Sequence, residues 1–131
     1  MRRISPAGHV RDRVLDLARA PRDPIDVSRY AWLERAPGFK VHVLEDDPAA
    51  GRRTCLVWAR PGAAPPGHLH HGDENVLVLQ GAFRDERGTY RAGDVCHSRA
   101  GYTHHGETVV GDEDCVCYVV YYGAIEFLGE R

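Results

Sequence analysis

Two stretches of this chain decide its fold: residues 62–81 read GAAPPGHLHHGDENVLVLQG, and residues 93–104 read GDVCHSRAGYTH. The first stretch contains His68, His70 and Glu74 between two glycines, and the second ends on His104. Six of the eight histidines of the chain lie between positions 68 and 105. Solvated histidines without a shared role would be scattered, so the clustering indicates that these side chains act together.

The residue types and their spacing predict a metal centre. Imidazole nitrogens together with one carboxylate suit a divalent first-row metal such as Zn, Fe, Mn, Ni or Cu. Side chains at positions i and i+2 of a strand point to the same side, so His68 and His70 would face one interior. Glu74 follows after a short turn, and His104 would arrive from a different strand. We therefore predict one metal ion per chain, held by His68, His70, Glu74 and His104.

Length and composition indicate one ordinary globular domain. A chain of 131 residues has room for a single domain, and 43% hydrophobic with 27% charged residues is typical of globular proteins. The net charge of −2 gives no electrostatic footprint for nucleic acid or membranes. The sequence shows neither a signal peptide nor an apolar run of about 20 residues. We expect a cytoplasmic protein that binds neither nucleic acid nor membranes.

The cysteine content indicates free thiols. Cytosolic cysteines are generally reduced, and three of the four lie in apolar, strand-like runs where cysteine behaves as a small hydrophobe. Cys115 and Cys117 would place two sulfurs on one strand face, where a soft metal could bind, but core packing is the simpler interpretation. We predict that none of the four is a ligand or forms a disulfide: Cys55, Cys96, Cys115 and Cys117.

Hydrophobic periodicity divides the chain into an N-terminal arm and a β domain. Apolar residues at near-helical spacing predict one short helix between Gly8 and Pro21, and residues 26–34 would form an extended arm or a first strand. Alternating or continuous apolar runs predict the later strands over 39–44, 53–59, 75–80, 109–110 and 115–122. Frequent turns between short strands favour an antiparallel barrel or jelly roll. We predict an all-β domain over residues 31–131, preceded by a helix and arm over residues 1–30.

Three further histidines are expected outside the first set of ligands. His71 and His105 each adjoin a predicted ligand, and neighbouring strand residues face opposite ways, so both should point away from the metal. A supporting or substrate-contacting role stays open for either of them. His42 lies in an alternating strand and is expected to be a surface or packed residue.

The stretch from about Trp32 to Phe127 resembles the ChrR-like branch of the cupin superfamily. Besides the ligand pattern, the resemblance rests on the entry segment 37–47, PGFKVHVLEDD, and on the connection 76–94, VLVLQGAFRDERGTYRAGD. It implies a double-stranded β-helix, which is a small jelly-roll barrel. It also implies one Zn or Fe ion held by three histidines and a glutamate, which map onto His68, His70, His104 and Glu74.

The ChrR-like branch includes the C-terminal sensory domain of zinc-dependent anti-sigma factors. It also includes stand-alone dioxygenases that cleave β-diketones or hydroxylated acetophenones. This chain departs from the pattern in two places. Arg99-Ala-Gly101 stands where the branch usually has Pro-x-Gly, which would place an arginine at the barrel rim. The N-terminal arm carries only His9 and no cysteine before Cys55, which argues against a full anti-sigma factor.

Three functions remain open from the sequence. The first is a mononuclear non-haem iron dioxygenase acting on a small enolisable carbonyl compound, with Glu74 as the residue that tunes the metal. Its cavity would be walled by aromatic residues such as Trp58, Tyr90 and Tyr102. The second is a sensory or ligand-binding module that acts with a partner regulator. The third is a structural metal site, which the histidine-rich ligand set disfavours because closed structural zinc sites are usually cysteine-rich.

We also expect a homodimer. Small cupins often associate through sheet faces or edges, which covers strand edges that would otherwise pair without control. The arm from Ser28 to Trp32 is the expected contact, because its aromatic side chains need something to pack against.

Overall fold

The computed structural model describes residues 23–104 and 106–127 of the chain, and this part is almost entirely β. A 3-10 helix, η1 (Val27–Arg29), precedes the first strand. The strands in chain order are β1 (Leu33–Ala36), β2 (Phe39–Asp47), β3 (Arg52–Ala59), β4 (His68–His70), β5 (Glu74–Gln80), β6 (Ala82–Asp85), β7 (Gly88–Arg91), β8 (Val95–Ser98), β9 (Thr103–His104), β10 (Thr108–Val110), β11 (Cys115–Tyr122) and β12 (Ile125–Phe127).

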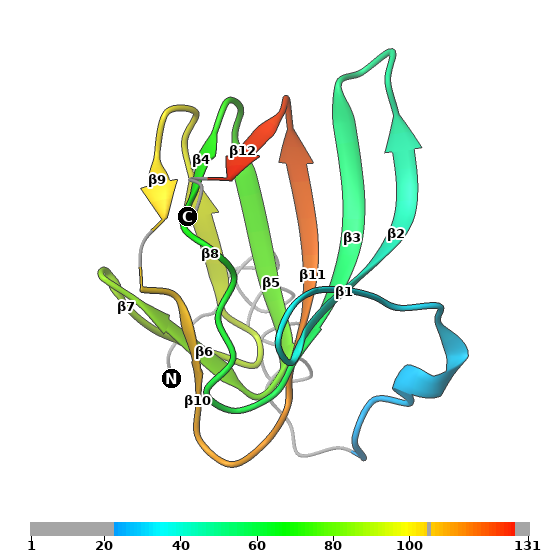
Figure 1. The fold of residues 1–131 in the computed structure, drawn as a ribbon, viewed down its shortest axis with the longest axis vertical. Coiled ribbons are helices and arrows are strands. Elements are labelled where there is room, and N and C mark those ends of the chain that lie inside the picture. The colour runs from blue at the N-terminus through cyan, green and yellow to red at the C-terminus, as the bar shows by residue number, and fades with distance from the viewer. Residues whose placement is uncertain (1–22, 105, 128–131) are drawn as a thin grey trace, which may run out of the picture.

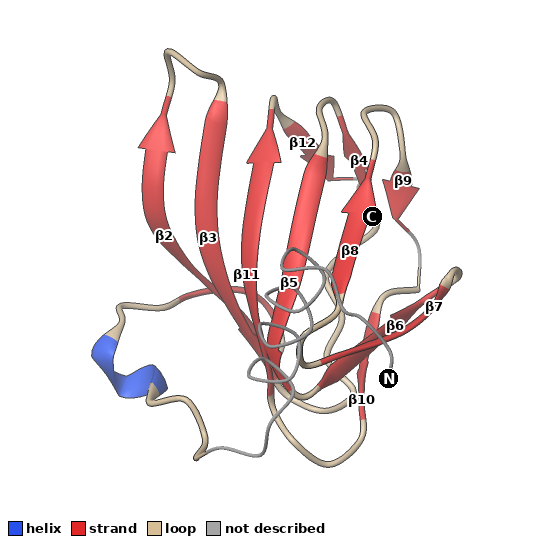
Figure 2. Cartoon of the chain, turned by 180° about the vertical axis from the view of Figure 1, so that it is seen from behind, coloured by secondary structure: helices blue, strands red, loops and turns tan. Residues whose placement is uncertain are grey.

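The strands form one large and two small antiparallel sheets. The six-stranded sheet has the order β1-β2-β3-β11-β5-β8, and the three-stranded sheets have the orders β10-β6-β7 and β12-β4-β9. Figure 1 shows the large sheet spread across the molecule, with β4, β9 and β12 near its upper end and β6, β7 and β10 near its lower end. The view from behind in Figure 2 shows the same arrangement. The predicted all-β architecture is thus confirmed.

The central strand β11 shows how the sequence produces the large sheet. β11 pairs along its full length with β3 on one side, and from Val116 to Tyr121 with β5 on the other. It is rich in valine and tyrosine, which favour a pleated, packed surface. Cys117 and Val119 are buried on its inner face, whereas Tyr118 between them is 38% exposed on the outer face. This period of two is what buries one face of the sheet against the rest of the domain.

The long strands and the short strand β10 were predicted, and most of the other short strands were not. The runs predicted over 39–44, 53–59, 75–80, 109–110 and 115–122 coincide with β2, β3, β5, β10 and β11. β6, β7, β8 and β9 have only two to four residues each, which is too short for alternation to be recognised. The predicted N-terminal helix lies outside the described residues, so the division into 1–30 and 31–131 stays a prediction. None of the described helices has the length and apolar character needed to cross a membrane.

All four cysteines are free and buried. That they are not metal ligands stays a prediction. Cys115 and Cys117 lie on the same face of β11 with their Sγ atoms 3.5 Å apart. Burial raises the pKa of Cys55 and of Cys96, because a low-dielectric interior disfavours the thiolate. Cys96, Cys115 and Cys117 pack in the hydrophobic core beside Val78 and Phe83.

The aromatic arm packs against its own chain. The Trp32 and Trp58 rings meet edge to face with centroids 5.5 Å apart, and the Trp32 Nε1–H donates to the Val27 carbonyl at 2.7 Å. Tyr30 stacks at a tilt on His42, with centroids 5.1 Å apart. We expected this arm to reach across a dimer because its aromatic rings need something to pack against. That reason is wrong, since these rings already pack against residues of their own chain. The homodimer itself stays a prediction.

A glycine of the first sequence motif forms the tight turn between β5 and β6. Gly81 has a positive φ of 72°, and a Cβ atom there would lie 2.6 Å from the Asp114 carbonyl oxygen. Gly111 also has a positive φ, of 84°, but a Cβ atom there would meet nothing within 4 Å. The two glycines share the backbone conformation and differ in the space around them.

We expect Gly81→Ala to destabilise the protein more than Gly111→Ala. Both substitutions force a side chain into the left-handed region, at a cost of about 1–2 kcal/mol. Only Gly81→Ala adds a steric clash with backbone, for which overpacking costs of about 1–3 kcal/mol are typical. Urea denaturation of the two variants and the wild type measures the difference. Equal losses of stability would contradict the close approach of the β5–β6 turn to Asp114.

Candidate metal centre

Two short paired strands bring the histidines together. His68 and His70 lie on β4 and His104 on β9, and the antiparallel register sets His68 directly opposite His104. The His70 N–H donates to the Tyr102 carbonyl at 3.0 Å, and the Gly101 N–H donates to the His70 carbonyl at 2.7 Å. The expectation that the last histidine arrives from a different strand is confirmed.

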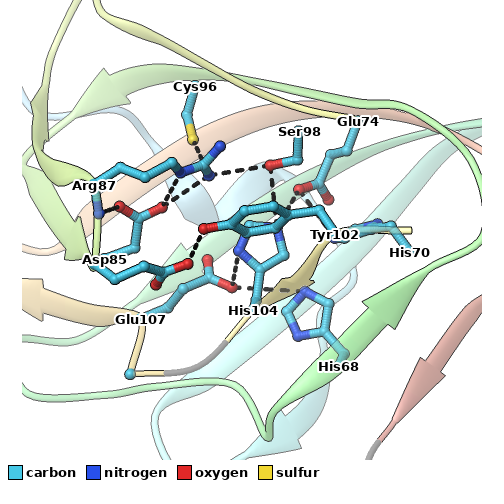
Figure 3. Close-up of polar contacts among 12 residues, drawn as sticks. His68, His70, Glu74, Asp85, Arg87, Cys96, Ser98, Tyr102, His104 and Glu107 are labelled. Atoms are coloured by element: carbon cyan, nitrogen blue, oxygen red, sulfur yellow. Dashed lines mark hydrogen bonds and ion pairs between the residues drawn. The ribbon is translucent and has the colours of Figure 1, made fainter. Parts of the chain in front are cut away.

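The three imidazole rings converge in the interior. Each pair of ring centroids is 4.8 Å apart, and one nitrogen from each ring can be chosen so that all three lie within 4.8 Å of one another. All three residues are buried, and His70 is fully so. Figure 3 shows the rings facing a common space together with two carboxylates.

The His68 ring presents one particular nitrogen to this space. Its Nδ1 lies 3.0 Å from the Pro66 carbonyl oxygen, and a carbonyl oxygen can only accept a hydrogen bond. The hydrogen is therefore on Nδ1, which leaves the Nε2 lone pair for a metal ion. Burial lowers the pKa of His68, although the bond to Pro66 opposes this shift, so the ring is held in the neutral form that binds metals.

Glu74 contributes a carboxylate from the first residue of β5. Its Oε1 lies 3.3 Å from His70 Nε2 and 3.6 Å from His104 Nε2. Burial disfavours the charged form of Glu74, but the contacts with His104 and His70 outweigh burial and lower its pKa to about 2. The preceding turn is held in place because Asp73 accepts hydrogen bonds from the Tyr122 N–H and the Ala100 N–H, each at 2.9 Å.

A second carboxylate, that of Glu107, lies beside the same histidines, and it was not predicted from the sequence. Glu107 Oε1 lies 3.1 Å from His104 Nδ1 and 3.6 Å from His68 Nε2. Burial raises the pKa of Glu107 to about 7, although the positive charge that His104 can carry opposes the shift. In the sequence, Glu107 is recognisable only as an acidic residue three positions after His104. No strand-like pattern around Glu107 marks it as part of the site.

A polar network supports His104 from the side away from Glu107. Ser98 Oγ lies 3.2 Å from His104 Nε2, and Arg87 donates to Ser98 Oγ at 3.1 Å and to the buried Asp85 carboxylate at 2.8 Å. The Arg87 guanidinium also lies 4.3 Å from the centre of the Tyr102 ring, as a cation–π pair. These contacts lock the ring orientation, and they were missed because they join β6, β8 and β9 only in the folded state.

The remaining candidates that the structure describes lie away from the three converging histidines. The His71 side chain is 51% exposed and its Nε2 is 3.8 Å from Glu126 Oε2, so it points away as predicted. Arg99 is exposed in the turn before β9. His105 lies outside the described residues. His42 is half-buried, and its Nδ1 lies 2.8 Å from the Ala31 carbonyl oxygen, in agreement with a packed role.

A cavity of about 590 Å³ adjoins the histidine cluster. Its walls are mostly inward-facing apolar residues of β2, β3 and β11, such as Val41, Val57 and Val119, and it reaches His68, Glu74 and Glu107. The aromatic residues predicted to wall the cavity are the wrong ones: the lining contains none of Trp58, Tyr90 and Tyr102, and its aromatic members are Phe39, Phe83 and Tyr121. Trp58 faces the other side of β3, where its Nε1–H donates to Asp114 at 2.8 Å, and Tyr90 stacks on Phe83.

The unsatisfied polar atoms of this cluster fit a bound metal ion. Four buried atoms have no hydrogen-bond partner among the described residues: His70 Nδ1 and Nε2, His104 Nδ1 and Glu107 Oε1. Buried polar groups in native proteins are rarely left without a partner. Three imidazoles with carboxylates form a donor set that a divalent first-row metal satisfies, so the residues present are suited to hold one.

Comparison with known proteins agrees with this geometry. A family model described as the ChrR cupin-like domain matches residues 21–126. The anti-sigma-E factor ChrR of Cereibacter sphaeroides is 34% identical over 108 residues, which cover 74% of this chain and 48% of that protein. The chain thus spans about half the length of this curated relative.

Solved structures share the fold. The complex of Rhodobacter sphaeroides SigE with the anti-sigma factor ChrR matches with a TM-score of 0.64 at 26% identity, over 92% of this chain and 70% of that one. An acetylacetone dioxygenase from Acinetobacter johnsonii matches with a TM-score of 0.69 at 18% identity, over 85% of this chain and 79% of that one. The second likeness shows the fold alone. Together with the family match, the paired strands and converging histidines show that this chain belongs to the ChrR cupin-like domain family of the cupins.

Proposed function

We propose that the chain binds one divalent transition-metal ion through His68, His70, Glu74 and His104 and uses it as an oxygen-dependent enzyme. The proposed reaction is carbon–carbon cleavage of a small enolisable carbonyl compound of the β-diketone or hydroxyacetophenone type. The observation that carries the proposal is the buried histidine cluster at the edge of an apolar cavity of about 590 Å³. A cavity of this size and lining is typical of small-molecule sites.

Different residues of the cavity would have different roles in such an enzyme. Apolar walls such as Val41, Val57 and Val119 would hold the carbon skeleton of a substrate and exclude water. His68 and Glu74 mark the end of the cavity where the carbonyl oxygens would lie. A bound Fe(II) ion would supply redox chemistry, which Zn(II) lacks. Glu74 is ionised at neutral pH, so we assign it the catalytic role of a fixed negative charge that tunes the centre.

A second candidate function is a sensory cupin module that acts with a protein partner. The observation in its favour is the 34% identity to an anti-sigma-E factor. The complex of ChrR with SigE also suggests the class of such a partner, a sigma factor on another chain. In this alternative the cavity would hold a signal molecule, and the metal centre would change the contacts made by the domain surface.

We expect purified protein to contain one metal ion per chain, and His70→Ala to lose it. His70 is fully buried, and its Nε2 has no hydrogen-bond partner among the described residues, so the variant removes a donor that nothing replaces. His71→Ala is the matched control, since its ring is half exposed and faces away. Elemental analysis of the wild type and the two variants measures the metal content per chain. Full metal content in His70→Ala would contradict the ligand assignment.

If the chain is the dioxygenase, activity will require Fe(II) and O₂, and Zn(II) will bind without supporting turnover. The physical reason is that zinc has no redox chemistry. Oxygen uptake by protein reloaded with each metal, in the presence of diketones and acetophenones, measures this. Equal activity with both metals would indicate hydrolysis or isomerisation. No uptake with any of these compounds would favour the sensory module.

We expect Val57→Phe to weaken substrate or ligand binding while it leaves the metal content unchanged. Val57 lines the cavity and has no polar side-chain atom that could hold the metal, so the larger ring takes up only space meant for the ligand. Val95→Phe introduces the same ring at a position that is 59% exposed and serves as the control. Calorimetric titration with candidate carbonyl compounds compares the variants. Unchanged affinity in Val57→Phe would place the ligand elsewhere.

A further inference from the structure

A row of polar side chains crosses the inner face of the large sheet at the level of the metal centre. The antiparallel register sets five residues opposite one another in turn: Asp46, Arg53, Tyr121, Glu74 and Ser98. The row thus runs from β2 through β3, β11 and β5 to β8, which lie side by side in Figure 2. Residues directly opposite each other in an antiparallel pair share one face of the sheet, so this polar row connects the metal centre with the β2–β3 hairpin.

The next row on the same face is apolar, and this contrast places the polar row along one edge of the cavity. It consists of buried residues that pair with one another across β3, β11, β5 and β8: Cys55, Val119, Val76 and Cys96. Four members of the polar row also line the cavity, namely Asp46, Arg53, Tyr121 and Glu74. A ligand that fills the cavity therefore meets polar side chains along this edge, and the metal centre occupies only one end of it.

The Tyr121 hydroxyl carries a hydrogen that no described residue accepts. Its oxygen accepts a hydrogen bond from Arg53 Nη1 at 3.4 Å, and Arg53 Nη2 donates to Asp46 at 2.9 Å. A phenol is a donor as well as an acceptor, and among the described residues Arg53 is the only hydrogen-bond partner of this hydroxyl. Tyr121 is partly buried against the core and lines the cavity, so its hydrogen is available to an acceptor inside the cavity.

The same part of the cavity wall carries a cation without a counter-ion. Arg35 of β1 is exposed to solvent and lines the cavity, and it forms no ion pair with any described residue. The two carboxylates on this part of the wall are paired with other arginines: Asp46 with Arg53 at 2.9 Å and Asp47 with Arg52 at 3.4 Å. Burial raises the pKa of the Cys55 thiol, and the positive charges of Arg53 and Arg35 oppose this rise. Both guanidinium groups therefore lie within electrostatic reach of one residue of the cavity wall.

We propose that Tyr121, Arg53 and Arg35 bind a carboxylate group of the cavity ligand, while the carbonyl end of the same molecule lies at the metal centre. This inference rests on the proposed function and narrows its substrate class to enolisable carbonyl compounds that carry a carboxylate on a short carbon chain. Tyr121 and Arg53 lie one and two strands away from Glu74, which corresponds to about 5 Å and about 10 Å between backbones. A ligand whose two polar groups are separated by a few carbon atoms spans such a distance.

Two matched diketones test the proposal by calorimetric titration of the protein as purified, under argon so that no oxygen-dependent turnover occurs. Succinylacetone carries a carboxylate where butyrylacetone has a methyl group, and the two compounds are otherwise alike. We expect the wild type to bind succinylacetone more tightly, by on the order of 10-fold, because hydrogen bonds to a charged group are stronger than those to a neutral one. Equal affinities, a preference for butyrylacetone, or no binding of either compound would overturn the proposal.

Two variants assign the preference to the named side chains. Tyr121→Phe removes only the hydroxyl and Arg35→Gln removes only the charge, so each should abolish most of the preference for succinylacetone and leave the affinity for butyrylacetone unchanged. Tyr122→Phe is the matched control, because Tyr122 is the next residue of β11, is 41% exposed and faces the other side of the sheet. An unchanged preference in either test variant would overturn the subsite, as would an equal loss of affinity for both compounds in Tyr121→Phe.

The same compounds distinguish this proposal from the proposed function. None of the three subsite residues is a proposed metal ligand, so His70→Ala should bind both compounds more weakly and keep the preference between them. A preference that disappears in His70→Ala would show that the carboxylate binds the metal instead, which would overturn the subsite. A wild type that prefers succinylacetone and takes up no oxygen would remove the enzyme and keep the subsite. Oxygen uptake with both compounds at equal affinity would keep the enzyme and remove the subsite.

Discussion

The pairing of β4 with β9 is the contact on which the metal centre depends. It places His68 directly opposite His104 across two strands of only three and two residues. Such short strands cannot be stable alone, so they are held by their surroundings. β12 pairs with the other edge of β4, and backbone hydrogen bonds join His70 to the turn at Gly101 and Tyr102. The turn after β4 is also joined to the large sheet, because the Tyr122 N–H at the end of β11 donates to the Asp73 carbonyl at 2.9 Å.

Burying this cluster of ionisable side chains costs free energy of folding, and a functional role explains why the protein keeps it. Three buried imidazoles and two carboxylates converge where an apolar core would be more stable. The surrounding residues reduce part of this cost, since Ser98 contacts His104 and Arg87 neutralises the buried Asp85. Several donor atoms nevertheless remain unsatisfied by the described protein. Real proteins break packing rules of this kind chiefly at functional sites, which agrees with a centre built to receive an ion.

The cavity beside the histidine cluster gives the protein a place to bind a small molecule. Residues at alternate positions of β2, β3 and β11 give it an apolar wall, so it can remove a small organic molecule from water. An enzyme and a sensor would use the same cavity and the same ligands. They would differ only in the event after binding, which is turnover in the enzyme and a change of partner contacts in the sensor. For this reason family membership alone does not decide between them, and a fold can host either activity.

The sequence by itself determined the fold class, the long strands and the first four candidate ligands. His68 and His70 are two residues apart on a strand, and this local spacing fixes their common direction whatever surrounds them. The alternation over β11 likewise predicts a buried face before any partner is known. These features depend on near neighbours in the chain, and near neighbours are what periodicity can reveal.

Only the tertiary structure decided that Glu107 lies beside the histidines, which residues support His104 and which residues line the cavity. Glu107 lies in a connection between two very short strands, and its meeting with His68 depends on how β4 and β9 pair. Trp58, Tyr90 and Tyr102 were expected to wall the cavity, but the strand face on which an aromatic side chain lies depends on register, which a single sequence shows only weakly. Contacts between distant segments are set by packing of the whole domain, so local pattern cannot supply them.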